Sequence, residues 1–308
     1  MTATSAPSDG GPKNPLGTLK KILFPVAPAY LLMVIPAIVL FTFFIIYPAI
    51  QGMFYSFTNY VGYGTFHSIG FANYKAAFND PTIRDSYGFT LLFAVVACVV
   101  TNVVALSLAI ALNAKIKWRT GMRTIFFMPL VLSGLIVSYI FTFIISTSVP
   151  IISAAIHFAP LESNILANQH LAWLGVVFVA SWVAIPGAII IFLAGLTGIP
   201  TEVYEAASID GASAWTKFRR MTFPLLFPFL IINTILSFKN FLNVYDIVVG
   251  LTGGGPGTAT TSVAQTIFSG FFNGDYAYQM ANAVIFFLIT LLFAVFQLGV
   301  IRRRGGGL

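Results

Sequence analysis

The amino-acid sequence predicts an all-α integral membrane protein with six transmembrane helices. Hydrophobic residues make up 58% of the 308 residues and charged residues only 8%, whereas a soluble domain carries about 25% charged residues. The apolar residues gather in runs long enough for a helix to cross a hydrocarbon core of about 30 Å. The runs lack the period-two alternation of membrane β-strands and are about twice as long as such strands need. Composition and run length together exclude a soluble globule and a disordered chain.

Six nearly uncharged segments are the expected spans. They lie at about 25–47, 89–113, 124–146, 171–196, 225–249 and 279–301. Each reaches the roughly 20 residues that a membrane-spanning helix requires. The first is uncharged from Ile22 to Ile50, far longer than the apolar core of a signal peptide, so we expect it to remain in the protein. Residues 22–304 are expected to form one membrane domain, between a disordered tail at 1–21 and a short tail at 305–308.

Basic residues fall on alternate sides of the spans. Thirteen of the 16 would share one side, whereas the other side carries only Lys75 and Arg84, and Lys239 lies inside a span. By the positive-inside bias the richer side is cytosolic, which places both termini in the cytosol. The 13 residues of that side are Lys13, Lys20, Lys21, Lys115, Lys117, Arg119, Arg123, Lys217, Arg219, Arg220, Arg302, Arg303 and Arg304.

The loops offer little enzymatic chemistry. His67, His157 and His170 fall in outer loops without the spacing that lets two side chains share a metal ion. Cys98 has no partner for a disulfide, so a buried structural thiol is expected. The glycine-rich run 253–257 lacks the Lys-Ser/Thr ending of a phosphate loop and is interpreted as a turn. We therefore expect a protein that is not an enzyme and holds no metal or cofactor itself, with energy supplied by a gradient or by a partner.

The segment 199–224 lies between the fourth and fifth spans, on the side expected to be cytosolic. A helix start is predicted at Thr201, because Pro and Thr precede an acidic residue, and Gly211 predicts its end. A second short helix that contains Lys217 would run to a break at Pro224. Two short helices joined by a tight turn would form a docking knob for a soluble partner. A connector that lies on lipid headgroups fits these residues equally well.

A family pattern distinguishes these two interpretations. The pattern runs Glu-Ala-Ala, three residues, Gly, nine residues, an apolar residue, one further residue and then Leu-Pro. This sequence matches it at Glu205, Ala206, Ala207, Gly211 and Pro224 and departs from it, by apolar replacements, at Met221 and Phe223. The segment resembles the coupling loop of importer permeases of the ATP-binding cassette class. The run Leu251-Thr252-Gly253-Gly254-Gly255-Pro256 resembles a loop of the carbohydrate-uptake branch, which includes permeases similar to the larger maltose permease subunit and glycerol-phosphate permeases.

The resemblance implies a type I importer permease fold and a set of partners. These are a second homologous permease subunit, two ATPase subunits that bind ATP and Mg, an extracytoplasmic solute-binding protein and the lipid bilayer of a bacterial or archaeal cell membrane, with no nucleic acid. Closure of the ATPase dimer would move the loop as a lever, which is a two-state switch. The residues expected to contact the ATPase are Glu205, Ala206, Ala207, Asp210, Gly211 and Arg219.

The fifth span carries polar side chains that lipid disfavours. These side chains form two rows at helical spacing, Asn233-Ser237-Asn240 and Lys239-Asn243-Asp246. The two rows would share one broad helix face directed into a wet cavity. Hydrogen bonding between helices is the alternative reason for such a face. The resemblance favours a cargo site, because similar sugar permeases line their cavity with this helix and the fourth one. The candidate cargo-binding residues are Ser237, Lys239, Asn240, Asn243, Tyr245, Asp246 and Trp182.

Several other functions remain open at this stage. A permease of the same class could carry glycerol-phosphate esters, amino acids or another small solute. A gradient-driven transporter would need titratable groups at mid-membrane, for which Lys239 and Asp246 are the candidates. A structural or signalling membrane subunit is the third alternative. Neither the sugar nor its length follows from the sequence.

Overall fold

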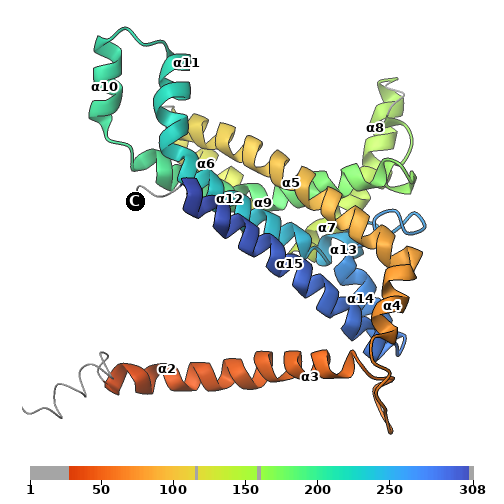
Figure 1. Ribbon diagram of the computed structural model, residues 1–308. Coiled ribbons are helices and arrows are strands. Elements are labelled where there is room, and N and C mark those ends of the chain that lie inside the picture. The colour runs from red at the N-terminus through yellow and green to blue at the C-terminus, as the bar shows by residue number, and fades with distance from the viewer. Residues whose placement is uncertain (1–27, 115–116, 158–160, 305–308) are drawn as a thin grey trace, which may run out of the picture. The chain divides into compact units, whose positions relative to one another are not determined.

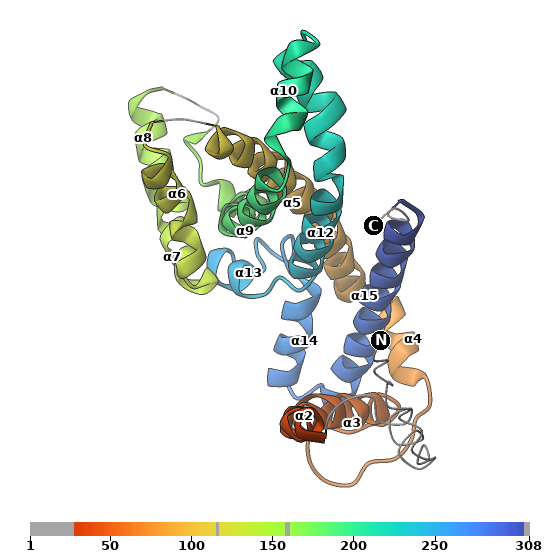
Figure 2. The same cartoon turned by 90° about the vertical axis from the view of Figure 1, so that its left-hand side faces the viewer.

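The computed structural model describes residues 28–114, 117–157 and 161–304 of the chain. The expected tails, and Lys115 of the basic cluster, lie outside these residues. In the described part the chain is helical, and its pairing of extended backbone is limited to one bridge between Thr58 and Ser68. The chain divides into two units, Met1–Phe54 and Tyr55–Leu308, which are described separately below (Figures 1 and 2).

The first unit contains one long helical run. It consists of α2 (Pro28–Phe41), the π-helical turn η1 (Thr42–Ile46) and most of α3 (Tyr47–Tyr55). Its apolar stretch 32–55 is long enough to cross a membrane. The run therefore corresponds to the first expected span, displaced toward the C-terminus.

The second unit contains the remaining helices, which begin after a loop at 56–71. Its helices are α4 (Ala72–Asn79), α5 (Pro81–Asn113), α6 (Arg119–Phe127), α7 (Gly134–Phe143), α8 (Val149–Ala155), α9 (Ala172–Thr197), α10 (Thr201–Ile209), α11 (Ala214–Lys217), α12 (Phe223–Leu242), α13 (Asp246–Leu251), α14 (Val263–Phe272) and α15 (Tyr276–Arg304). Short turns join some of them: η2 (Met128–Val131), η3 (Ile144–Ser148), η5 (Ile165–Ala167) and η6 (Phe218–Thr222). Counting the first unit, six helices of the described part are long and apolar enough to cross a membrane, as the sequence predicts.

Three prolines inside helical runs follow a π-helical turn, whereas Pro36, Pro186 and Pro228 lie within ordinary α-helices. In each of the three cases the π-helical turn ends two residues before the proline, and the next N–H bonds to the carbonyl five residues earlier. The wider turn accommodates a residue that has no N–H and whose ring clashes with an ordinary helix. The break expected at Pro224 is therefore wrong, because one helix runs from Ala214 to Leu242. The turns and their prolines are η1 with Pro48, η3 with Pro150 and η6 with Pro224.

The third and fifth apolar runs differ from their expected bounds. Near Pro129, α6 gives way to η2, and the helix long enough to span a membrane is 134–155 in place of 124–146. At the fifth span, the helix ends at Leu242, not near 249, and a separate helix α13 begins at Asp246. The first difference arises inside apolar sequence, where hydropathy gives no signal for a helix end, and the second falls at the polar residues Asn243 and Asp246, whose spacing also fits a helix face.

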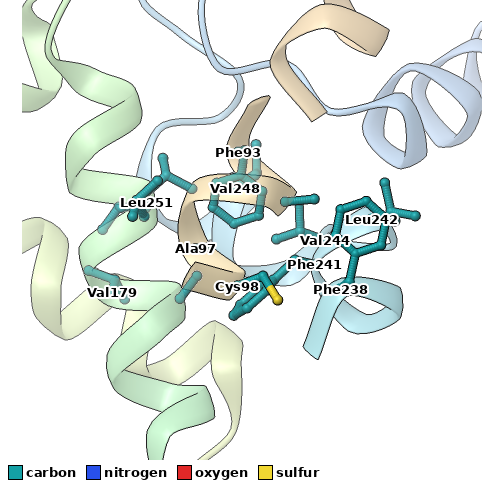
Figure 3. Packing of buried hydrophobic residues seen from close by; sticks show 14 of the residues in the cluster. Phe93, Ala97, Cys98, Val179, Phe238, Phe241, Leu242, Val244, Val248 and Leu251 are labelled. Carbon is teal, nitrogen blue, oxygen red and sulfur yellow. The ribbon is translucent and has the colours of Figure 1, made fainter. Parts of the chain in front are cut away.

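The core of the second unit lies between α5, α9 and α12. Its larger cluster includes Phe93, Ala97, Val179, Phe241 and Val248, which Figure 3 shows packed together. Small residues on α5 allow α9 to approach closely, as is usual where helices pack in lipid. On α9, a Cβ added at Gly195 would lie only 2.7 Å from a ring carbon of Phe229, so α12 crosses α9 at a position that only glycine permits.

The start of α5 is fixed to α15. The Asp80 carboxylate accepts a hydrogen bond from the Thr82 N–H and another from the Tyr278 hydroxyl, both at 2.8 Å. Burial raises the pKa of Asp80, but these hydrogen bonds, with one from the Ile83 N–H, outweigh it and hold the pKa below its usual value. The carboxylate therefore serves as a cap for α5 and as a tie between two long helices.

Candidate functional site

The segment between α9 and α12 folds as a helical hairpin, at the opposite end of the second unit from α4 and α14 (Figure 1). Helix α10 begins at Thr201 as predicted and ends at Ile209, two residues before Gly211, whose φ of +70° suits glycine. The Gly211 N–H bonds to the Ser208 carbonyl at 3.2 Å, and the Ala212 N–H bonds to the Ala207 carbonyl at 2.9 Å. This pair of bonds is a Schellman motif, which satisfies the last carbonyls of the helix.

The return helix is held against α10 by side-chain hydrogen bonds. Ser213 caps α11 by accepting from the Thr216 N–H. The Lys217 ammonium donates to the Ser208 hydroxyl at 2.7 Å, and the hydroxyls of Tyr204 and Thr222 lie 3.0 Å apart. These links join both arms near the tip and near the base, so the hairpin is built to move as one body.

Most of the residues predicted to contact an ATPase are exposed on the hairpin. Glu205, Ala206, Asp210, Gly211 and Arg219 are all exposed. Ala207 is only 1% exposed, so its methyl group packs within the hairpin and supports the turn without reaching a partner.

Two apolar residues of the hairpin are not among those predicted from the sequence. Ile209 is 88% exposed and Trp215 is 67% exposed, one on each side of the turn. We add both residues to those predicted to contact a partner, because large apolar and aromatic side chains dominate protein interfaces. The only available signal was their position beside Gly211, where a turn places neighbouring side chains at the tip.

A cavity of about 470 Å³ lies between α9, α12 and α13, in the range of small-ligand sites. The break between α12 and α13 builds its polar wall. Because the helix ends at Leu242, the polar residues 243–246 do not continue the helix face that the sequence predicted. The Asn243 side chain donates to the Lys239 carbonyl at 2.9 Å and thereby closes the end of α12. Its amide oxygen is left to accept a hydrogen bond from a ligand.

The structure brings together five of the seven residues predicted to bind cargo. They line the cavity with Asn233, which is only 1% exposed and donates to the Ala188 carbonyl at 3.1 Å. The ring of Tyr245 packs on Phe268 at 4.7 Å between centroids. The five predicted residues are Ser237, Asn240, Asn243, Tyr245 and Asp246.

The other two predicted residues do not line this cavity. Trp182 belongs to a different hollow, on the opposite face of α9, and packs against Phe141 with 5.2 Å between ring centroids. The cavity-facing residues of α9 include Ala180, Ala184 and Gly187, which follow helical spacing and leave Trp182 behind them. Lys239 is exposed on α12 outside the cavity, and its carbonyl holds Asn243.

An apolar helical bundle, a cavity with a polar wall and an exposed hairpin at one end are the features expected of the class of membrane permease subunits. The sequence places this chain within that class. Residues 101–305 match the family described as the binding-protein-dependent transport system inner membrane component, and the chain belongs to this family. It is thus a permease subunit of an ATP-binding cassette importer, as predicted.

Relatives along nearly the whole chain include several permease proteins. The chain is 37% identical over 268 residues to the multiple sugar-binding transport system permease protein MsmF of Streptococcus mutans, covering 86% of this chain and 92% of MsmF. It is 34% identical to the probable starch degradation products permease AmyD of Thermoanaerobacterium thermosulfurigenes, covering 89% and 94%. It is 29% identical to the sn-glycerol-3-phosphate permease UgpA of Agrobacterium fabrum, covering 93% and 99%.

Solved structures share the fold. A chain of a bacterial ABC transporter that imports the acidic polysaccharide alginate superposes with a TM-score of 0.79 at 20% identity, covering 94% of this chain and 99% of that one. A chain of the alginate transporter in complex with an alginate-bound periplasmic protein gives a TM-score of 0.77 at 20% identity, covering 94% and 96%. The predicted type I importer permease fold is confirmed.

Proposed function

We propose that this permease forms, together with a second homologous membrane subunit, the path by which a neutral sugar or oligosaccharide enters the cell. Two relatives are named for the transport of sugars or of starch degradation products. The cavity at the α12–α13 break supports the same cargo, because amides, hydroxyls and an aromatic ring are the groups that bind sugars.

The charge of the cavity favours a neutral sugar over a glycerol-phosphate ester. Among the described residues that line it, none is Lys, Arg or His, and Asp246 is acidic. A phosphate ester is normally held by Arg or Lys through charge-assisted hydrogen bonds, and a carboxylate in its place would repel it. A glycerol-phosphate cargo, suggested by the similarity to UgpA, would therefore need its basic contacts from elsewhere.

The geometry supplies a route from ATP to the cavity. The helix that starts in the hairpin at Ala214 runs without a break to Leu242. Asn240, which lines the cavity, lies near the end of this helix. Two ATPase subunits with bound ATP and Mg would hold the hairpin by Ile209, Trp215 and the exposed coupling residues. When the ATPase subunits close, the hairpin would tilt the helix 214–242 and change the shape of the cavity. This is coupling by contacts that differ between two states. An extracytoplasmic solute-binding protein would deliver the cargo to the other side.

The orientation in the membrane follows the basic residues. The hairpin with Lys217, Arg219 and Arg220 lies at one end of the second unit, whereas α4 with Lys75 lies at the opposite end (Figure 1). The positive-inside bias places the hairpin end in the cytosol of a bacterial or archaeal cell, together with both termini.

Uptake of a panel of labelled sugars and of glycerol 3-phosphate tests the cargo and its site. We expect Asn240→Ala to reduce sugar uptake at limiting concentration by about tenfold, since one lost hydrogen bond to the cargo costs about 1–2 kcal/mol. The matched control is Thr234→Ala on the same helix, outside the cavity, which should transport normally. Normal sugar uptake by the Asn240→Ala variant, or uptake of glycerol 3-phosphate alone, would contradict the proposal.

A further inference from the structure

The region between α5 and α6 carries positive charge with no acidic neighbour in the sequence. No Asp or Glu occurs between Asp85 and Glu162, a stretch that includes all of α6 and α7. The only ion pair among the described residues joins Arg84 to Asp85, far along the chain. The charge of this region therefore lacks a counter-ion from its own part of the chain. Its basic residues are Lys115, Lys117, Arg119 and Arg123.

Two of these residues form a paired cationic site on α6. Arg119 and Arg123 are one turn apart, and both are partly buried. Their Nε atoms are shielded from solvent and have no hydrogen-bond partner among the described residues, although Arg123 Nη2 donates to the Leu112 carbonyl at 3.4 Å. Like charges at this spacing repel each other, and shielded donors without acceptors cost free energy. An anion with several oxygens would remove both penalties.

An apolar groove begins at the same helix. It has a volume of about 500 Å³ and lies between α5, α6, η2 and α9. Ile125 and Phe126 of its wall follow Arg123 by two and three residues, a rise of only about 3–5 Å along the helix. Its lining includes Val104, Leu108, Ile125, Met128, Trp182 and Ile185.

Trp118 adds an aromatic ring at the same level. It is 81% exposed immediately before α6, and exposed tryptophans collect at the boundary between hydrocarbon and headgroups. This places the arginine pair at headgroup depth and the groove below it, in the hydrocarbon layer. A molecule that fits both must carry a negative head on an apolar chain.

We propose that this surface binds one anionic phospholipid, with the phosphate between Arg119 and Arg123 and an acyl chain in the groove of Val104 and Ile185. The lipid would neutralise the two guanidinium groups and fill the space between α5 and α9. Trp182, a predicted cargo residue that the cavity excludes, then contacts lipid. The site lies behind the cargo cavity, on the opposite face of α9.

Native mass spectrometry of the purified full-length chain in detergent, titrated with dioleoylphosphatidylglycerol or dioleoylphosphatidylcholine, tests the headgroup contact. We expect Arg119→Gln/Arg123→Gln to weaken phosphatidylglycerol binding about thirtyfold and to leave phosphatidylcholine binding unchanged. The matched control is Arg219→Gln/Arg220→Gln, which removes the same charge from the hairpin and should retain the lipid. Equal loss in both pairs, or equal affinity of the wild-type chain for the two lipids, would overturn the proposal.

A second pair of variants tests the groove. Val104→Trp fills the groove, whereas Val103→Trp places the same ring on a neighbouring residue that is 59% exposed and outside the groove. We expect only Val104→Trp to release phosphatidylglycerol. If inorganic phosphate competes fully with the lipid, the site binds a free anion and the proposal fails. If the arginine variant loses the ATPase subunits in the assembled transporter and keeps the lipid, the site binds a protein and the proposal also fails. No arm of the test depends on knowing the cargo.

Discussion

Gly211 allows the coupling hairpin to be tested without disturbing the rest of the protein. Its φ of +70° lies in the left-handed region, where a residue with a side chain costs roughly 1–2 kcal/mol more than glycine. A Cβ at this position would meet no atom within 4 Å. The cost of Gly211→Ala is therefore one of backbone conformation only, and it falls at the exposed tip of the hairpin.

This cost is large enough to measure and too small to unfold the protein. A penalty of about 1–2 kcal/mol lowers the ratio of capped to uncapped hairpin by roughly 5- to 30-fold. We expect Gly211→Asn to stay near wild type, because Asn tolerates this region, and Gly211→Ala to couple less well. Gly211→Arg adds bulk at the tip and should abolish coupling.

The assay is cargo-stimulated ATPase activity of the assembled transporter, with subunit assembly followed by co-purification. The account predicts the order glycine, Asn, Ala, Arg for stimulation, with assembly retained in all four. Full stimulation of Gly211→Arg would refute the role of the hairpin as a lever. Loss of assembly in Gly211→Ala would show instead that the turn is needed only for folding.

Three further predictions follow from the packing, the charge and the orientation. Gly195→Ala should lower the temperature of unfolding in detergent, since its Cβ would lie 2.7 Å from Phe229 and overpacking costs about 1–3 kcal/mol, whereas Gly187→Ala on the same helix meets no neighbour and should not. Asp80 has a lowered pKa, so its contribution to stability is present above its unfolded pKa of about 3.9 and is lost as pH falls through its folded pKa; Tyr278→Phe raises the folded pKa and should therefore make this acid loss smaller and complete at a higher pH in a thermal unfolding series, and an unchanged pH profile would count against the tie. Reporters fused near Thr120 and after Arg304 should report cytosol and one near Phe66 the outside, and a cytosolic signal at Phe66 would reverse the assigned orientation.

The sequence predicted the number of spans and the turn that follows α10 because both depend on local signals. Long apolar runs define spans, and a proline, an acidic first turn and a glycine define α10. Helical periodicity could not locate the helix end at Leu242, because Asn243 and Asp246 continue the four-and-three spacing of Lys239 and so fit one polar helix face. The side chain of Asn243, which can cap a helix, was the one available sign.

Two features of the site required the fold. The cavity and the apolar groove share α9, and only the packing of α5 against one face shows that Trp182 points away from Asn240. The continuous helix 214–242, which joins the hairpin to the cavity, could not be predicted either, because a proline such as Pro224 normally ends a helix. The π-helical turn η6, which carries the helix past this proline, has no established sequence signal.

Import by the complete transporter tests the central claim most directly. The permease would be reconstituted in proteoliposomes with its second membrane subunit, its ATPase subunits and its solute-binding protein. Transport of labelled neutral sugars and of glycerol 3-phosphate would be measured with and without ATP on the side of the ATPase subunits. The account predicts uptake of a neutral sugar that requires ATP and that falls about tenfold with Asn240→Ala. Sugar uptake at the same rate without ATP, or uptake of glycerol 3-phosphate alone, would contradict the proposed function.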